Sequence, residues 1–296
     1  MNQMGTTVDG DVGQHSGNAI IRGLRAIFLE RRLPYRVDVA LNSVMTQLGS
    51  RTRIVRHADF RFCVRRKQGF ALNTDEAFIQ NILVRREYTP PGFEIEPRDT
   101  VIDIGGNIGT FAIMAAKLAR NGRVFAFEPG SENFALLKRN AKLNAADNVS
   151  CFHLAVSDAA GSIRLNLAED GGYHSTENGG GSAFETVECV SLRDIFDRNA
   201  IERCDFLKLD CEGAEYRILH ALPDDYFGRI GKIAMEWHAV GVGMNDPEAK
   251  RRDIETLMSH LKARGFRIDA FEEFPPPFLG GHVRASRIQP EKIGPP

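Results

Sequence analysis

The sequence predicts an α/β protein with a Rossmann-like wound sheet, and three observations support this prediction. An apolar run at 101–104 has the composition of a buried parallel strand, and a glycine turn follows it directly. A second apolar run at 124–127 continues the alternation of strand and helix. The helix expected after the glycine turn carries apolar residues on one face: Phe111, Met114, Ala115 and Leu118.

The glycine turn argues against a dinucleotide. Gly105, Gly106 and Gly109 let the backbone bend sharply and let a ligand approach closely. A dinucleotide fingerprint needs glycines at its first, third and sixth positions. Counted from Gly105, the third and sixth positions are Asn107 and Thr110, so the fingerprint fails at both.

An acidic residue, Asp103, precedes this turn and indicates a different cofactor. A carboxylate at that position would repel a pyrophosphate, but it suits a ligand that carries an ammonium and a sulfonium group. S-adenosylmethionine is such a ligand. A second acid, Glu128, ends the run 124–127, nineteen positions after Gly109. An acid about 20 residues past the turn accepts hydrogen bonds from ribose hydroxyls in wound folds, so we expect Glu128 to bind ribose. The alternative is an acid that only stabilises the start of a helix.

Composition limits the other classes. The chain has 296 residues, 43% of them hydrophobic, and a net charge of -1, which suits one large α/β domain with extensions. Five cysteines without CxxC spacing indicate reduced thiols. No signal peptide or long apolar run is evident, so we expect a soluble, cytoplasmic protein without a membrane span.

The expected domains are a disordered tail at 1–17, a basic extension or cap at 18–92, the main domain at 93–288 and a tail at 289–296. Residues 18–67 hold twelve Lys and Arg against three acids. Such a stretch can bind nucleic acid, but its interleaved apolar residues favour a helix docked on an acidic domain, and nucleic-acid binding is disfavoured.

Further elements follow in order along the chain. A helix is expected over 132–143, one strand over 149–156 that leads to Asp158, and a glycine-rich loop over 169–182 that is either a substrate lid or only flexible. A fourth core strand runs from Asp205 into acidic residues. Lys208, Asp210 and Glu212 alternate with apolar residues there, so they share one side while the strand persists. Glu215 is interpreted as an acid at a helix N-terminus.

A fifth strand at 232–238 carries Glu236 and His238 two positions apart. Carboxylates on neighbouring strand ends, with an imidazole nearby, can deprotonate a hydroxyl or hold a divalent cation such as magnesium. The metal ligands would be Asp210, Glu212 and Glu236. The bland alternative for His238 is a satisfied, half-buried side chain. The other histidines have no comparable neighbours in the sequence: His15, His57, His153, His174, His220, His260 and His282.

These motifs, taken in order, resemble the FkbM family of S-adenosylmethionine-dependent methyltransferases. The resemblance rests on ThrValIleAspIleGlyGlyAsnIleGlyThrPhe, PheGluPro, AlaValSerAsp, LysLeuAspCysGluGlyAlaGlu and MetGluTrpHis, and it covers roughly 87–271. It implies a class I fold with a seven-stranded, mostly parallel sheet and, commonly, O-methylation of sugar or natural-product hydroxyls. It also implies that the cofactor is bound by Asp103, Gly105, Asn107, Gly109, Glu128 and Asp158, and that Asp210 lies near the methyl group.

For catalysis the sequence favours His238 or Asp210 as the base, with Glu212 and Glu236 orienting the acceptor or a cation. The acceptor is expected to be a small molecule or carbohydrate, bound by segments without a readable code. Two alternatives stay open from the residues: an NAD-dependent oxidoreductase on the same sheet, and a noncatalytic cofactor-binding protein.

Overall fold

The structure is a computed structural model that describes residues 51–66, 74–167, 183–238, 247–275 and 280–288. The chain divides into two compact units, 1–54 with 66–71 and 55–65 with 72–296. All the elements that build the site belong to the second unit. The predicted tails 1–17 and 289–296, the glycine-rich loop 169–182 and residues 18–50 of the predicted extension lie outside the described residues.

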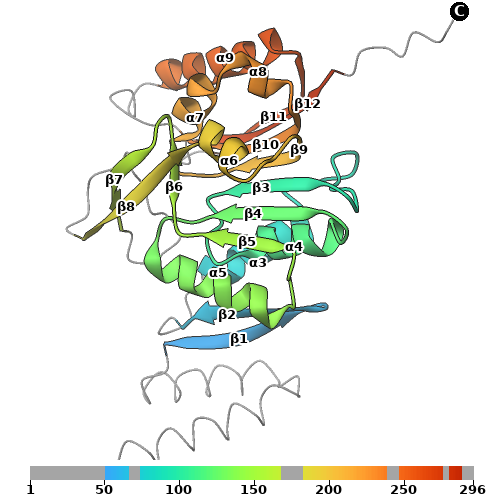
Figure 1. The fold of residues 1–296 in the computed structure, drawn as a ribbon, viewed down its shortest axis with the longest axis vertical. Helices are drawn as coiled ribbons and strands as arrows, with labels where there is room; N and C mark the ends of the chain where they lie inside the picture. Colours follow the sequence, from blue (N-terminus) through green and yellow to red (C-terminus); the bar gives the residue numbers. More distant parts are fainter. Residues whose placement is uncertain (1–50, 67–73, 168–182, 239–246, 276–279, 289–296) are drawn as a thin grey trace, which may run out of the picture. The chain divides into compact units, whose positions relative to one another are not determined.

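A seven-stranded sheet forms the centre of the second unit and confirms the predicted fold class (Figure 1). Six strands run parallel and β12 is antiparallel to both of its neighbours. The chain order reverses beside β3, where ligands bind in open parallel sheets. The strands lie side by side in the order β11 (Phe266–Glu273), β12 (Gly280–Arg287), β10 (Ile230–His238), β9 (Cys204–Leu209), β3 (Thr100–Ile104), β4 (Arg123–Phe127) and β5 (Val149–Phe152).

Two smaller sheets and eight helical segments complete the described part of the chain. The small sheets are the pair β1 (Thr52–His57) and β2 (Phe60–Arg65), and the three strands β6 (Ala155–Ser157), β8 (Phe184–Ser191) and β7 (Gly161–Asn166). The helical segments are α3 (Thr74–Gln80), the π-helix η1 (Asn81–Arg85), α4 (Thr110–Leu118), α5 (Ser131–Leu143), α6 (Leu192–Arg198), α7 (Glu215–Ala221), α8 (Asp224–Phe227) and α9 (Pro247–Ala263). None of these helices is long and apolar enough to cross a membrane.

Helix α4 is buried on two sides rather than along the one predicted face. Phe111 and Ala115 pack with residues of β3 and β4, as expected. Ile113, on another side, packs with Phe62 of β2. The prediction was wrong for Leu118, which is 39% exposed at the end of the helix. A single sequence gives the period of a helix but not the number of layers that cover it.

A buried amide fixes α5 against β2 and against the glycine turn. Asn140 Oδ1 accepts a hydrogen bond from the Cys63 backbone N–H at 2.6 Å. Asn140 Nδ2 donates to the carbonyl oxygens of Cys63 at 3.1 Å and Ile108 at 2.8 Å. These bonds satisfy backbone groups that would otherwise be buried without partners, so they hold the turn in position.

The strand predicted over 149–156 is two strands in two different sheets. β5 pairs with β4 in the large sheet, whereas β6 pairs with β8 in the small one. The chain leaves the sheet at His153, whose ring stacks on Phe134 at 4.8 Å. The apolar pattern is continuous through this break because β6 is buried and β5 is partly buried, and the pattern does not reveal which partner a strand pairs with.

Candidate functional site

The turn after β3 is tightly packed against the neighbouring strand end. Gly105 has φ +79, and a Cβ built on it would lie 1.7 Å from the carbonyl oxygen of Asp210. Gly109 has φ +90 and Asn107 has φ +49, so the turn passes twice more through the left-handed region. Only glycine meets both demands at position 105, because it has no Cβ and little preference for the sign of φ.

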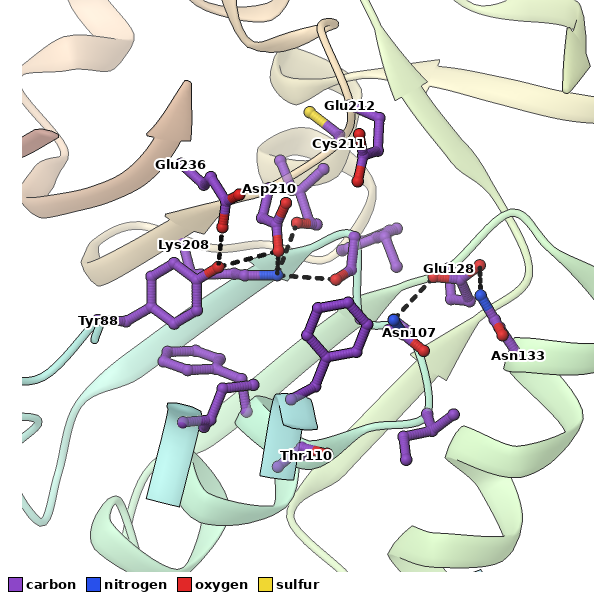
Figure 2. Close-up of a pocket in the computed structure, with 18 of the residues that line it drawn as sticks. Tyr88, Asn107, Thr110, Glu128, Asn133, Lys208, Asp210, Cys211, Glu212 and Glu236 are labelled. Carbon is purple, nitrogen blue, oxygen red and sulfur yellow. Dashed lines mark hydrogen bonds and ion pairs between the residues drawn. The ribbon is translucent and has the colours of Figure 1, made fainter. Parts of the chain in front are cut away.

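Glu128 lies directly beside this turn, as predicted from its spacing. Its Oε2 accepts a hydrogen bond from the Asn107 backbone N–H at 2.7 Å, and its Oε1 accepts from Asn133 Nδ2 at 3.3 Å (Figure 2). The same Oε1 also accepts from the Gly130 N–H at 2.8 Å. Burial raises the pKa of Glu128 to about 7, and the three donors oppose that rise. The alternative interpretation, an acid that only stabilises the start of a helix, does not account for this hydrogen bond to the turn.

Two further polar atoms next to the turn have no hydrogen-bond partner within the described residues. They are Asn107 Oδ1 and Thr110 Oγ1, both buried. Buried polar groups are nearly always satisfied in folded proteins. Because both residues line the cavity described next, a ligand in that cavity would find two unsatisfied groups.

One cavity of about 600 Å³ contains both the glycine turn and the acids at the strand ends. Its lining includes Gly105, Asn107 and Glu128 from the cofactor side, and the four predicted catalytic residues Asp210, Glu212, Glu236 and His238 from the other side. The sequence-based prediction therefore grouped residues that lie up to 133 positions apart in the chain, and the fold places them around one cavity. Such a volume suits a nucleoside-bearing ligand with a second molecule beside it.

Three predicted cofactor residues do not line this cavity: Asp103, Gly109 and Asp158. Asp103 is fully buried, and its Oδ1 lies 3.2 Å from Lys208 Nζ. Burial raises the pKa of Asp103, whereas the ammonium of Lys208 lowers it. Asp158 follows β6 and accepts a hydrogen bond from Ser157 Oγ at 2.8 Å.

Lys208 lies between the glycine turn and the acids at the strand ends, and it contacts both. Its Nζ donates to the carbonyl oxygen of Gly105 at 2.7 Å and lies 3.5 Å from Asp210 Oδ2. The expected alternation beyond Lys208 is not maintained, because β9 ends at Leu209. Glu212 then adopts φ +54, a strained conformation for a residue other than glycine.

Four ionisable side chains meet at the carboxyl ends of β9 and β10. His238 Nε2 lies 3.4 Å from Glu236 Oε1, 3.6 Å from Glu212 Oε2 and 3.9 Å from Asp210 Oδ1. On the other side of the ring, Nδ1 lies 3.1 Å from Glu215 Oε1. His238 is thus partly buried and has a hydrogen-bond partner, as the alternative of a satisfied, half-buried side chain also requires, but it is not isolated, since acids surround both of its nitrogens.

These neighbours perturb one another strongly. Burial would lower the pKa of His238, but Glu215, Glu236 and Glu212 outweigh it and raise that pKa well above the usual value. Burial raises the pKa of Glu212 to about 8. Burial would also raise the pKa of Glu236, but hydrogen bonds and charge from His238 and His282 lower it instead. Strongly shifted groups of this kind cluster at functional sites.

Three residues of the cluster were missed by the sequence analysis. The Tyr88 hydroxyl is 2.9 Å from Asp210 Oδ2 and 3.2 Å from Glu236 Oε2 (Figure 2). His282 Nε2 is 3.6 Å from Glu236 Oε2, so the prediction that His282 lacks acidic neighbours was wrong. Glu215 begins α7 as expected, but it is fully buried against His238 rather than acting only on the helix.

His282 is placed in the site by strand pairing, and Tyr88 by the packing of a segment outside the strands. β12 runs antiparallel to β10 with Glu236 opposite His282, and that register joins positions far apart in the chain. Tyr88 comes from the segment after η1, within the range predicted as an extension. The signal that could have found Tyr88 was weak: a single aromatic residue beside an acid, Glu87, ahead of the first core strand.

Residues 103–268, more than half of the chain, match the family model described as the methyltransferase FkbM domain. The chain belongs to the FkbM methyltransferase family. The protein is therefore an S-adenosylmethionine-dependent methyltransferase rather than an NAD-dependent oxidoreductase.

Curated relatives of this FkbM-family protein act on different molecules. The 31-O-demethyl-FK506 methyltransferase FkbM of Streptomyces tacrolimicus is 28% identical over 72% of this chain and 89% of its own length. The hexuronic acid methyltransferase AglP of Haloferax volcanii is 27% identical over 57% of this chain and 65% of its own length. Among solved structures, M. jannaschii TYW2 in complex with AdoMet has a TM-score of 0.43 at 16% identity, over 81% of this chain and 88% of that chain.

Proposed function

We propose that this methyltransferase transfers a methyl group to a hydroxyl oxygen of a sugar or natural-product acceptor. The observation that carries the proposal is the single cavity in which the glycine turn faces the acid and histidine cluster. The relatives named for a demethylated natural product and for hexuronic acid support this class of acceptor. A hydroxyl needs both alignment with the methyl group and a group to take its proton, and a cluster of carboxylates offers the second.

The proposed cofactor contacts follow from the cavity. Glu128 would accept hydrogen bonds from the ribose hydroxyls of S-adenosylmethionine, while Gly105, Asn107 and Gly109 shape the turn beneath it. Asp103 would act through Lys208, which it pairs with, rather than by direct contact. Asp158 would contribute from outside the cavity lining.

The proposed reaction is a direct displacement. The acceptor oxygen forms a bond to the methyl carbon as the bond from carbon to sulfur breaks, and the electron pair of that bond stays on sulfur. The hydroxyl proton passes to a carboxylate of the cluster formed by Asp210, Glu212 and Glu236. His238 is the weaker candidate for base, because the surrounding acids raise its pKa and keep a proton on the ring.

The test uses methyl-labelled S-adenosylmethionine with a panel of sugars, uronic acids and hydroxylated natural products. We expect a methyl ether as product, identified by mass spectrometry and NMR. Glu128→Ala should weaken the binding of S-adenosylhomocysteine at least tenfold by calorimetric titration, because the ribose loses a buried carboxylate partner. Product methylated only on nitrogen or on a carboxyl group would reject the proposal, as would tight binding by the Glu128→Ala variant.

The pH dependence of cofactor affinity tests Glu128 separately. Its carboxylate form accepts ribose hydrogen bonds, and burial holds its pKa at about 7 in the unliganded protein. Affinity should therefore be nearly full at pH 8 and fall about fivefold between pH 7 and pH 6, because the proton must then be removed on binding. Titrations of wild type and Glu128→Gln across this range check the prediction. The Glu128→Gln variant should bind weakly and with no such slope; a slope retained in that variant would assign the effect to another group.

A further inference from the structure

We propose that Asp210, Glu236 and His238 bind a divalent metal ion at the acceptor end of the cavity. For its role in the reaction the inference rests on the proposed function, but metal binding itself can be tested alone. One ligand atom from each of the three side chains lies within 4.8 Å of the others. The three residues come from the carboxyl ends of the adjacent parallel strands β9 and β10, so the sheet itself sets their spacing.

The first argument is the spacing of the inner atoms. His238 Nε2 is 3.4 Å from Glu236 Oε1 and 3.9 Å from Asp210 Oδ1. Good hydrogen bonds from nitrogen to oxygen are shorter, at about 2.7 to 3.2 Å. Two atoms that each lie about 2.0 to 2.2 Å from a common ion are roughly 3.0 to 3.5 Å apart. The 3.4 Å separation fits two ligands of one ion, whereas the 3.9 Å separation is longer than either range, so Asp210 Oδ1 would move inward when an ion binds.

The second argument is that each carboxylate is held by its other oxygen. The Tyr88 hydroxyl contacts Asp210 Oδ2 and Glu236 Oε2, not the two oxygens that face His238 (Figure 2). Lys208 Nζ also lies on Asp210 Oδ2, and His282 Nε2 lies on Glu236 Oε2. These outer contacts leave Asp210 Oδ1 and Glu236 Oε1 as the carboxylate oxygens nearest to His238 Nε2. Ligands of bound metals are usually oriented by such outer partners.

The third argument is the buried carboxylate behind His238. Glu215 is fully buried, its Oε1 is 3.1 Å from His238 Nδ1, and its Oε2 has no hydrogen-bond partner within the described residues. A carboxylate there holds a proton on Nδ1, so a metal that displaces the second proton of the ring would be bound by Nε2, the usual arrangement of a metal-bound histidine.

The ligand set favours an ion that accepts both oxygen and imidazole. Carboxylates suit Mn²⁺ and Mg²⁺, and Mn²⁺, a transition-metal ion, also accepts an imidazole ligand. Either ion would keep coordination positions open for the acceptor. The ion would hold the acceptor hydroxyl and lower its pKa. The hydroxyl proton would then pass to Glu212, the carboxylate that borders the three ligands without being one of them.

The only tryptophan of the chain provides the measurement. Trp237 lies between two of the ligands in the sequence and is 5% exposed. We would treat the full-length protein with a chelator and titrate it with Mn²⁺, following tryptophan fluorescence and the electron paramagnetic resonance signal of free Mn²⁺. We expect saturable binding of one equivalent at micromolar concentration. Mg²⁺ added afterwards should compete.

Three variants give the result its specificity. Glu236→Gln and Asp210→Asn should weaken Mn²⁺ binding at least tenfold, and Glu215→Gln, which keeps all three ligands, should weaken it 10- to 100-fold. Glu128→Gln alters an acid of the same cavity that is not a ligand, and it should bind Mn²⁺ as wild type does. Binding of S-adenosylhomocysteine by the ligand variants shows that they are folded.

Two outcomes overturn the inference: no saturable Mn²⁺ binding by wild type, or binding that Glu236→Gln and Asp210→Asn leave unchanged. Methyl transfer to a hydroxyl by metal-free protein would also reject the proposed role. Tight Mn²⁺ binding without any methylated hydroxyl product would instead reject the proposed function and leave the metal site standing.

Discussion

Gly105→Ala is expected to abolish cofactor binding and to lower the free energy of unfolding by more than about 4 kcal/mol. The new Cβ would lie 1.7 Å from the carbonyl oxygen of Asp210, far inside any allowed contact. The turn has no room to move away. The Gly105 N–H donates to the carbonyl oxygen of Phe127 at 3.0 Å, and its own carbonyl oxygen accepts from Lys208 at 2.7 Å. Urea unfolding and titration with S-adenosylhomocysteine measure the two effects.

Gly92→Ala is the matched control for backbone strain. Gly92 has φ +88, close to the φ of Gly105, but a Cβ built on it would have nothing within 4 Å. The control should therefore lose only about 1 kcal/mol, the usual cost of placing a side chain in the left-handed region. The loss of stability in Gly105→Ala minus the loss in Gly92→Ala gives the cost of the collision with Asp210. Equal losses in the two variants would show that the conformation, not the close approach, is what requires glycine at position 105.

The core of the fold could be predicted because its signals are local. The strand at 101–104, the glycine turn and the strand at 124–127 each show their character within a few residues. Glu128 was selected for the same reason, since its spacing from the turn is a local signal, and the structure places its carboxylate against the Asn107 backbone N–H of the turn. The prediction of one strand over 149–156 was wrong because the apolar pattern fits two consecutive strands equally well. Only the pairing partner of each strand shows that the two belong to different sheets.

The acceptor end of the site was predictable only where strand ends carry acids. Asp210 follows β9 and Glu236 lies near the end of β10, and these parallel neighbours end at the same edge of the sheet. His282 could not be found in this way, because it enters on the antiparallel strand β12. Tyr88 precedes the first core strand, and its contact with both acids depends on the packing of the segment after η1 against the sheet edge.

His238→Ala is expected to lower turnover at least about 100-fold while changing the affinity for S-adenosylmethionine less than about threefold. The ring contacts acids at the acceptor end, and none of its contacts in the described residues reaches the turn or Glu128. Steady-state kinetics at saturating acceptor, with calorimetric titration of the cofactor, separates the two quantities. His220→Ala is the control, because His220 is exposed on α7 away from the cavity and should leave turnover unchanged.

The two ends of the cavity therefore respond to substitution in different ways. Loss of cofactor affinity in His238→Ala, in parallel with turnover, would mean that His238 supports the shape of the whole cavity rather than the chemistry at one end. Unchanged turnover would remove His238 from the reaction, and with it the ligand that the metal proposal needs. A selective loss of turnover, set beside the loss of binding in Gly105→Ala, would mean that one cavity binds the methyl donor at the glycine turn and activates the acceptor at the strand ends.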